Sequence, residues 1–395
     1  MAERRYVIIG AGVAAVTAAE TIRKADAAGE ILLLSREKEL PYARPMLSKS
    51  PLLSMELKRM TLHDAAWYWE HRITLRLGTT VDGLDTDRHA VYCGDEEIPY
   101  DKCILATGSR NFIPPFPGRE TVDACDIRTI DDLRRVRRLA VPGGKAVVIG
   151  GGVIGLEMAA EIGRYGMSVT VLEALDRLMP RLIDADTSAW LERHLPLDIV
   201  TGVSITALRR QGNKTVVEDK TGRSWTCDLL IVSCGIRAET ALAREAGITC
   251  DRAIVVNEKM ETSAPDVYAC GDCAEFRGVN VALWNQGLAQ GAVAGANASG
   301  GEAYYAGCDS SLIMMMDGVG LFALGDLGQS GEGYRVEEYD WPALQSLLVD
   351  PRRPAVPGHG RKVWKDGRLV GAVLLGDLTR MYEWKREVLE RRTTE

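Results

Sequence analysis

Two stretches of the sequence decide the fold: YVIIGAGVAAVTAAE at residues 6–20 and AVVIGGGVIGLEMAA at residues 146–160. Each runs from an apolar segment that suits a strand, through a glycine-rich turn, into small residues that suit a helix. This order is typical of a dinucleotide-binding unit, in which the turn admits a pyrophosphate and the helix N-terminus stabilises its charge. The sequence therefore predicts two such units, about 140 residues apart.

The first turn has the pattern G-x-G-x-x-A, and an apolar segment at residues 30–35 completes a strand, helix and strand. We expect an acidic residue at the end of the second strand, where it would hold the ribose hydroxyls. The aligned position is Arg36, with Glu37 directly after it, so Glu37 is the candidate and the contact stays open. The turn's own candidates are Gly10, Gly12 and Ala15.

The second turn is a full G-x-G-x-x-G, and the strand that follows its helix ends in Glu173, about twenty residues later. A carboxylate at this place accepts hydrogen bonds from both ribose hydroxyls and repels a 2′-phosphate, which favours NADH over NADPH. The candidate nucleotide contacts are Gly150, Gly152, Val153, Ile154, Gly155 and Glu173.

Length and composition place the chain among multidomain globular proteins. It has 395 residues, 46% of them hydrophobic, and a formal charge of −7. The basic runs at residues 131–140 and 383–392 alternate with acidic residues like solvated helix faces, so nucleic acid is not an expected partner. We expect no membrane span and no signal peptide. Nine scattered cysteines fit a reducing compartment, so a cytoplasmic location is expected.

Three further segments accompany the two turns: CILATGSRNFIPPFPG from residue 103, ETSAPDVYACGDCAE from residue 261 and LWNQGLAQGAVAGAN from residue 283. In this order the five segments resemble those of the FAD-dependent pyridine nucleotide–disulfide oxidoreductases. The resemblance implies that the first turn holds FAD and the second receives NADH. It also implies that Asp272 binds the ribityl chain and that Trp284 lies at a flavin edge, although a buried core tryptophan is an alternative. The implied flavin contacts in these segments are Ala106, Thr107, Gly108, Gly271, Asp272 and Trp284.

The same resemblance implies the domain organisation. We expect an α/β protein with two Rossmann-like dinucleotide-binding domains and a smaller α+β C-terminal domain. The FAD domain would comprise residues 1–111 and 235–305, interrupted by an NAD(H) domain at residues 112–234. The C-terminal domain, residues 306–395, would contain paired strands, and Met314 to Met316 favour its core over a partner-facing surface. Its last helix could serve a subunit contact in a homo-oligomer or cover its own domain.

One absence distinguishes branches of the family. Members that reduce disulfides or peroxide carry a redox cysteine near the start of the FAD domain, but residues 1–92 contain none. In its place stands LPYARPMLSK, residues 40–49, which resembles rubredoxin reductases, ferredoxin reductases and the flavin portion of nitrite reductases. The resemblance places Lys49 near flavin N5, with Arg44 and Pro45 in the same wall; the alternative for Lys49 is a solvated side chain.

Glu157 lies two residues after Gly155, where the family has G-x-x-G-x-E. Its carboxylate could meet the nicotinamide or Lys49, and it could also be a first-turn glutamate that the helix dipole stabilises. Cys270 and Cys273 form a C-x-x-C without a second pair, so we interpret them as small buried residues and expect no metal site.

Together these features predict an enzyme that takes hydride from NADH onto FAD and passes electrons to a small iron–sulfur or rubredoxin-like carrier. Two alternatives stay open. The flavin could reduce oxygen directly, as an NADH oxidase does. The chain could instead be a redox sensor or assembly protein that binds FAD and NADH without sustained turnover.

Overall fold

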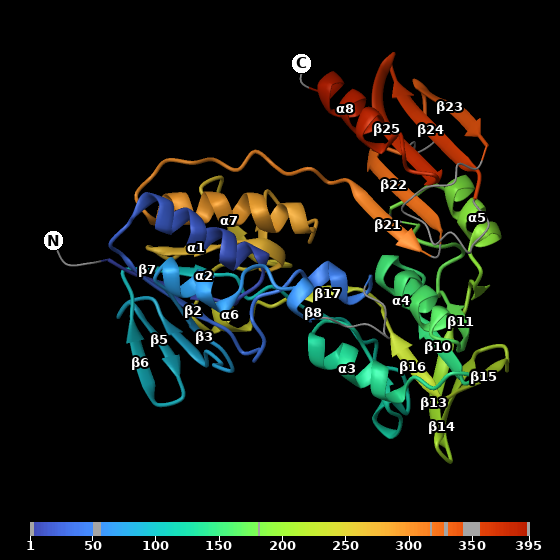
Figure 1. Cartoon of the computed structure of the whole chain (residues 1–395), viewed down its shortest axis with the longest axis horizontal. Coiled ribbons are helices and arrows are strands. Elements are labelled where there is room, and N and C mark those ends of the chain that lie inside the picture. Colours follow the sequence, from blue (N-terminus) through green and yellow to red (C-terminus); the bar gives the residue numbers. More distant parts are fainter. Residues whose placement is uncertain are drawn as a thin grey trace. The chain divides into compact units, whose positions relative to one another are not determined.

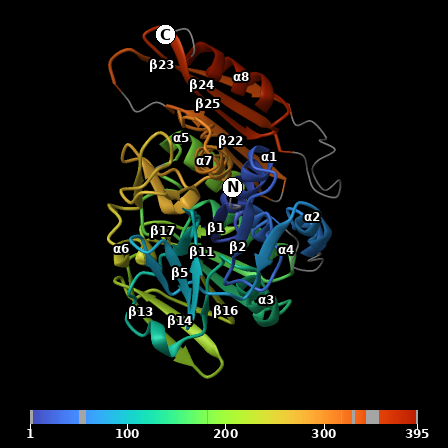
Figure 2. The ribbon, with the colours of Figure 1, turned by 90° about the vertical axis from the view of Figure 1, so that its left-hand side faces the viewer.

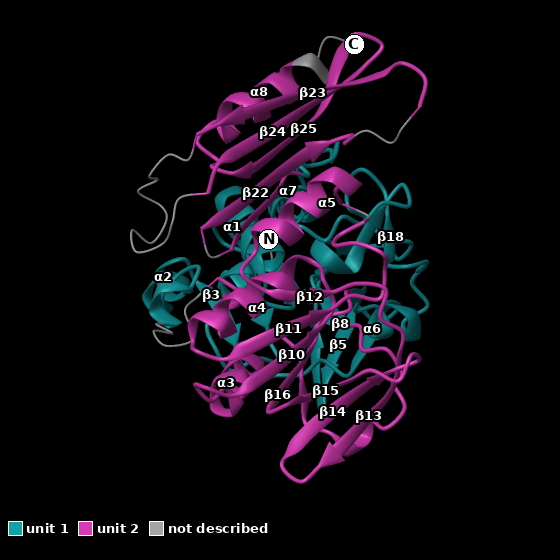
Figure 3. Ribbon diagram, turned by 90° about the vertical axis from the view of Figure 1, so that its right-hand side faces the viewer, with its two compact units in different colours: residues 1–46, 56–110, 236–310 teal, residues 47–55, 111–235, 311–395 magenta. Residues whose placement is uncertain are grey.

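The structure is a computed structural model that describes residues 4–49, 57–180, 182–316, 318–327, 331–342 and 356–392. The chain divides into two compact units, coloured separately in Figure 3. Unit 1 comprises residues 1–46, 56–110 and 236–310. Unit 2 comprises residues 47–55, 111–235 and 311–395.

Unit 1 is built on a five-stranded parallel sheet with the order β19-β7-β1-β2-β3. Helix α1 (Val13–Ala25) connects β1 to β2 and packs along α7 (Trp284–Ala298), as Figure 1 shows. Three glycines of α7 allow this approach, because a Cβ on Gly291 would lie 2.4 Å from the carbonyl oxygen of Ala14. The sheet strands are β1 (Arg5–Ile9), β2 (Glu30–Leu34), β3 (Ile73–Arg76), β7 (Lys102–Leu105) and β19 (Val267–Ala269).

Shorter elements complete unit 1. An antiparallel three-stranded sheet comes between β3 and β7 in the chain, and two further strand pairs are β8 with β17 and β18 with β20. These strands are β4 (Gly83–Asp85), β5 (Ala90–Cys93), β6 (Glu96–Pro99), β8 (Ser109–Asn111), β17 (Ile236–Ala238), β18 (Ile254–Val256) and β20 (Ala274–Phe276). The remaining helices are α2 (Ala65–Glu70) and α6 (Ala241–Glu245).

Unit 2 repeats this topology except at one edge of the sheet, where the strand β9 comes first in the chain instead of last. Its parallel sheet has the order β12-β11-β10-β16-β9, and α4 (Val153–Arg164) connects β10 to β11 as α1 connects β1 to β2. A three-stranded antiparallel sheet, β13-β14-β15, again comes between two strands of the parallel sheet in the chain, here β12 and β16. The strands are β9 (Ala124–Cys125), β10 (Lys145–Ile149), β11 (Ser168–Leu172), β12 (Asp198–Val200), β13 (Ile205–Gln211), β14 (Lys214–Asp219), β15 (Ser224–Cys227) and β16 (Leu229–Val232). The prediction of two Rossmann-like folds in an α/β protein is confirmed.

Capping explains where two further helices of this unit begin. α3 (Ile130–Leu139) starts at Thr129, whose side chain accepts a hydrogen bond from the Asp132 amide, and α5 (Ala185–His194) starts at Asp184 in the same manner. The basic run of α3 lies opposite its buried apolar residues, so it is a solvated face as predicted.

The turn between β14 and β15 is held by Asp219. Burial would raise the pKa of this carboxyl group, but hydrogen bonds from Thr221 and Arg223 outweigh it and lower the pKa to about 2.

The C-terminal part of unit 2 is an antiparallel sheet with the order β21-β22-β25-β24-β23, covered by α8 (Met381–Arg392), as Figure 2 shows. Trp384 and Val388 are buried in its core, so α8 covers its own sheet. The prediction that Met314 to Met316 are core is wrong for Met315, which is 38% exposed, because alternate residues of a strand point to opposite faces. The strands are β21 (Leu312–Met316), β22 (Val319–Gly325), β23 (Tyr334–Trp341), β24 (Gly358–Lys365) and β25 (Arg368–Gly376).

Candidate functional site

The first glycine turn lies between β1 and α1. Gly10 has φ +112°, and a Cβ there would lie 2.1 Å from the carbonyl oxygen of Ala106, so only glycine fits. A Cβ on Gly12 would meet nothing within 4 Å. Ala15 is fully buried in the first turn of α1. The backbone is therefore open at Gly12, directly before the helix N-terminus, and this arrangement fits a pyrophosphate.

The second turn repeats this geometry in unit 2. Gly150 has φ +113°, and its Cβ would lie 2.1 Å from the carbonyl oxygen of Ser233. Gly152 is again open, with nothing within 4 Å of a Cβ. At Gly155 a Cβ would lie 2.1 Å from the carbonyl oxygen of Gly150, so glycine is required where the helix packs on the turn. Val153 and Ile154 begin α4 directly after the open position.

Each unit has an acidic residue after the second strand of its glycine-turn motif: Glu37 after β2 and Glu173 after β11. These two carboxylates have different partners. Glu173 follows β11, and its carboxylate accepts hydrogen bonds from the amides of Gly151 (2.7 Å) and Leu175 (2.9 Å). It therefore lies beside the open glycine turn, as predicted for a ribose contact. Burial, together with the negative charge of Glu173, raises the pKa of the Cys234 thiol to about 11.

In unit 1, Glu37 is half-buried and Arg36 is exposed. The Glu37 carboxylate accepts hydrogen bonds from the Tyr42 hydroxyl (2.6 Å) and from Arg44 Nη2 (2.7 Å). Burial would lower the pKa of Arg44, but Tyr42, Glu37 and Asp272 outweigh it and the pKa is raised. Arg44 is therefore a fixed positive charge beside Glu37. The sequence did not predict a role for Tyr42; its only signal was an aromatic side chain within residues 40–49.

The two other flavin segments meet at Asp272. Asp272 Oδ2 accepts a hydrogen bond from Ser109 Oγ at 2.8 Å, and Thr107 Oγ1 donates to the backbone of Glu239 at 2.7 Å. The parallel pairing of β7 with β19 causes this meeting, because it brings Ala106 to Gly108 beside Gly271 and Asp272.

Buried amides of α7 fix the turn at Gly271, which has φ +79°. Gln290 Oε1 accepts from the Gly271 amide (2.8 Å), and Gln286 Nε2 donates to the Gly271 carbonyl oxygen (3.1 Å). Sequence reasoning missed both glutamines and Ser109, although polar residues on the buried face of a helix are a usable signal. Trp284, the first residue of α7, is half-buried.

Ser48, Lys49 and Glu157 come together within unit 2. The Glu157 carboxylate accepts hydrogen bonds from Lys49 Nζ (2.6 Å) and Ser48 Oγ (2.5 Å) and is 2% exposed. The expected contact between Glu157 and Lys49 is present, and the Lys49 side chain is paired while still 31% exposed. The first-turn alternative for Glu157 is wrong, because α4 has no acidic residue in its first turn.

The remaining candidate residues in the described part of the chain are two cysteines and a proline. Cys270 and Cys273 are fully buried, and burial raises the pKa of both thiols. Pro45 is exposed. Among the described residues, no group of three or more His, Cys, Asp or Glu side chains could hold a metal ion. Within the same residues, no helix has the length and apolar character to cross a bilayer.

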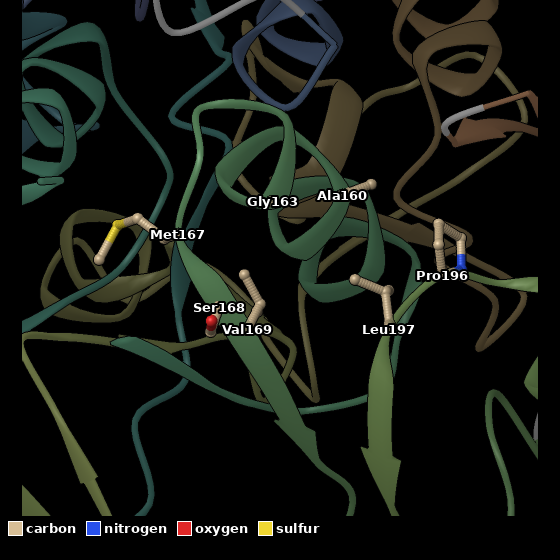
Figure 4. A pocket seen from close by; sticks show the side chains of 7 residues that line it. All are labelled: Ala160, Gly163, Met167, Ser168, Val169, Pro196 and Leu197. Atoms are coloured by element: carbon tan, nitrogen blue, oxygen red, sulfur yellow. The ribbon is translucent and has the colours of Figure 1, made fainter. Parts of the chain in front are cut away.

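A hollow of about 230 Å³ lies between α4 and the start of β11 (Figure 4). Its walls include Ala160 and Gly163 of α4, Met167 before β11, and Pro196 and Leu197 before β12. It is therefore at the amino ends of the parallel strands, whereas the glycine turn and Glu173 are at their carboxyl ends, where α/β sheets bind ligands.

Comparisons with known proteins agree with this geometry. Residues 4–295 match the model of the pyridine nucleotide–disulphide oxidoreductase family. The chain is 33% identical over 387 residues to a nitrite reductase [NAD(P)H] of Bacillus subtilis, covering 95% of this chain and 46% of that protein. It is 36% identical over 275 residues to the ferredoxin–NAD(+) reductase subunit of the benzene 1,2-dioxygenase system of Pseudomonas putida, covering 68% of this chain and 67% of that protein.

A solved structure of the covalent putidaredoxin reductase–putidaredoxin complex is similar to this chain, with 27% identity and a TM-score of 0.84. The match covers 99% of this chain and 94% of that chain. The chain spans less than half of the nitrite reductase, so it corresponds to one part of that larger protein. The two glycine turns, their shared topology and these matches lead to one conclusion: the chain belongs to the pyridine nucleotide–disulphide oxidoreductase family.

Proposed function

We propose that this chain takes hydride from NADH onto FAD and passes electrons to a rubredoxin-, ferredoxin- or other iron–sulfur-type protein. The observation that carries the proposal is the environment of residues 48 and 49. Where disulfide-reducing members of the family have a cysteine, this chain has Ser48 and Lys49 bound to the buried carboxylate of Glu157. The first cysteine of the chain is Cys93, so a thiol relay at this position has no residue to use. Electrons would then leave through an external acceptor.

The acceptor class is supported by two relatives. One is named as a ferredoxin reductase subunit, and one solved structure is of a reductase joined to putidaredoxin. Such electron-transfer encounters use small, transient interfaces.

The residue roles in this proposal follow from the site geometry. FAD, when bound, accepts a hydride and can release its electrons one at a time. Gly12 and the α1 N-terminus would hold its pyrophosphate, and Asp272 its ribityl chain. The remaining flavin contacts would be Gly10, Ala15, Glu37, Arg44, Pro45, Ala106, Thr107, Gly108, Gly271 and Trp284.

In the NADH site, Gly152 and the N-terminus of α4 would hold the pyrophosphate, and Glu173 would hold the ribose and discriminate against NADPH. Gly150, Val153, Ile154 and Gly155 would shape the same turn. Lys49 would place a positive charge at the flavin, and Glu157 would fix the position of its ammonium group. A cation there stabilises negative charge that develops on the ring during transfer.

The domain boundaries predicted from the sequence stay part of the proposal, with FAD bound by residues 1–111 and 235–305, NADH by 112–234, and a third domain at 306–395. We also propose a cytoplasmic location. Its support is that all nine cysteines are free thiols.

The test is an anaerobic stopped-flow experiment with purified, FAD-loaded protein. NADH should bleach the flavin absorbance rapidly, NADPH should do so much more slowly, and oxidised rubredoxin or ferredoxin should restore the colour. Rapid recovery with oxygen alone, unaffected by an iron protein, would replace the proposal with an NADH oxidase. Slow bleaching and a long-lived reduced complex would replace it with a sensor.

A further inference from the structure

We infer that Arg361, on β24 of the C-terminal sheet, is a positioning residue for the NADH site. It holds the N-terminus of α5, and α5 in turn holds Leu178, which packs against the glycine turn. The inference rests on the proposed function only in taking the turn at residues 150–155 as the NADH site. All residues involved belong to unit 2.

Arg361 is an unusual residue for a sheet interior, because its charged side chain is only 9% exposed. Its guanidinium group pairs with Asp184, the N-cap of α5, and lies 3.3 Å from Asp186 Oδ2 and 3.3 Å from Glu338 Oε1. Two of these three carboxylates are on or directly before α5. A buried arginine therefore joins the C-terminal sheet to the start of this helix.

Helix α5 in turn positions the segment after Glu173. The Ser188 amide donates to the carbonyl oxygen of Asp184 (3.0 Å), and the Ser188 hydroxyl accepts a hydrogen bond from the Leu178 amide (2.9 Å). Leu178 is fully buried, and its Cδ2 would lie 2.6 Å from a Cβ at Gly151. Gly151 is the residue whose amide binds Glu173. A continuous series of contacts thus runs from Arg361 to the glycine turn.

One described residue of this segment has a strained backbone. Met179, next to Leu178, is a buried non-glycine residue with φ +46°. Such a conformation persists only where the surrounding contacts impose it. Its carbonyl oxygen accepts hydrogen bonds from the amides of Leu182 and Ile183, which lead directly to Asp184. Releasing Asp184 would allow Met179 to relax and Leu178 to move away from Gly151.

The link can be cut without leaving an isolated buried charge. In an Arg361→Met variant, Asp184 keeps its hydrogen bonds from the Thr187 amide and hydroxyl, while Asp186 and Glu338 are exposed to solvent. In Asp184→Asn, the cap oxygen stays and only the charge opposite Arg361 is lost. The matched control is Arg335→Met on the neighbouring strand β23, since Arg335 is 62% exposed and pairs with Glu337 of its own strand.

The experiment measures the dissociation constant for NAD⁺ by calorimetry on the FAD-loaded full chain, and flavin reduction at increasing NADH concentrations. Arg361→Met and Asp184→Asn should each raise the NAD⁺ dissociation constant and the half-saturating NADH concentration about three- to tenfold, the size of coupling through such networks. The limiting reduction rate should not change. Arg361→Lys should recover part of the affinity, and the double variant should be no weaker than Arg361→Met alone.

NAD⁺ binding within twofold of the parent in both Arg361→Met and Asp184→Asn would overturn the inference, and so would an equal loss in Arg335→Met. If Arg361→Met does not fold, Arg361→Lys and Asp184→Asn decide the question. A parent protein that binds no NAD⁺ would overturn the proposed NADH site together with this inference, whereas normal parent binding with unaffected variants overturns the inference alone.

Discussion

Gly152→Ala offers a sharp test of the NADH site, because the structure separates its effect on folding from its effect on binding. Gly152 has an ordinary backbone conformation as the N-cap of α4, with φ −83°, and a Cβ there meets no atom within 4 Å. We therefore expect the variant to fold, with a loss of about 0.5–1 kcal/mol because alanine is a poorer N-cap than glycine. The open space is where the pyrophosphate would lie.

A methyl group in that space would displace the phosphate from the α4 amides. Hydrogen bonds to a charged group contribute about 1.5–3 kcal/mol, and the helix dipole adds up to about 1 kcal/mol. A net loss of about 2–3 kcal/mol corresponds to an affinity for NADH that is about 30- to 150-fold lower. The half-saturating NADH concentration in anaerobic flavin reduction measures this loss. FAD content should be unchanged.

Gly163→Ala is the matched control, because Gly163 is in the same helix and its Cβ would also meet nothing within 4 Å. It should stabilise the helix by up to about 1 kcal/mol and leave NADH binding unchanged. Thermal unfolding of both variants checks that each is folded. A Gly152→Ala protein that is reduced at the parent's NADH concentrations would refute the assignment of this turn to the dinucleotide.

Three further predictions follow from the same geometry. Lys49→Met removes one of two hydrogen-bond donors from buried Glu157 and should lower the free energy of unfolding, measured in urea, by about 1–2 kcal/mol. The loss is smaller than for a fully buried ion pair because Lys49 is 31% exposed. Unchanged stability would contradict this pairing. Glu173→Gln removes a charge that repels a 2′-phosphate, so the ratio of half-saturating NADPH to NADH should fall at least about tenfold, and a constant ratio would contradict the role. Asp219 has a folded-state pKa of about 2, below its usual value of about 4, so it stabilises the fold above pH ~4 and loses this effect as the pH falls toward 2. The stability difference between the parent and Asp219→Asn in urea should therefore shrink between pH 5 and about 2.5, and a pH-independent difference would be contrary to this expectation.

The sequence by itself determined the two Rossmann-like folds, because their signals are local. A glycine turn, the strand before it and the helix after it are contiguous, so the local sequence alone predicts the turns at Gly10 and Gly150. The apolar segments at the start of both stretches are the strands β1 and β10. The acid at Glu173 was also predictable, since its distance from the turn is fixed by the helix between them.

Only the tertiary structure decided which distant residues meet. Ser48 and Lys49 bind Glu157 more than 100 residues away, and no sequence period connects them. Arg361 likewise meets Asp184 across 177 positions. Burial decides these contacts: a charged group removed from water must find a partner wherever the fold supplies one, and sequence spacing within a single element does not reveal that partner.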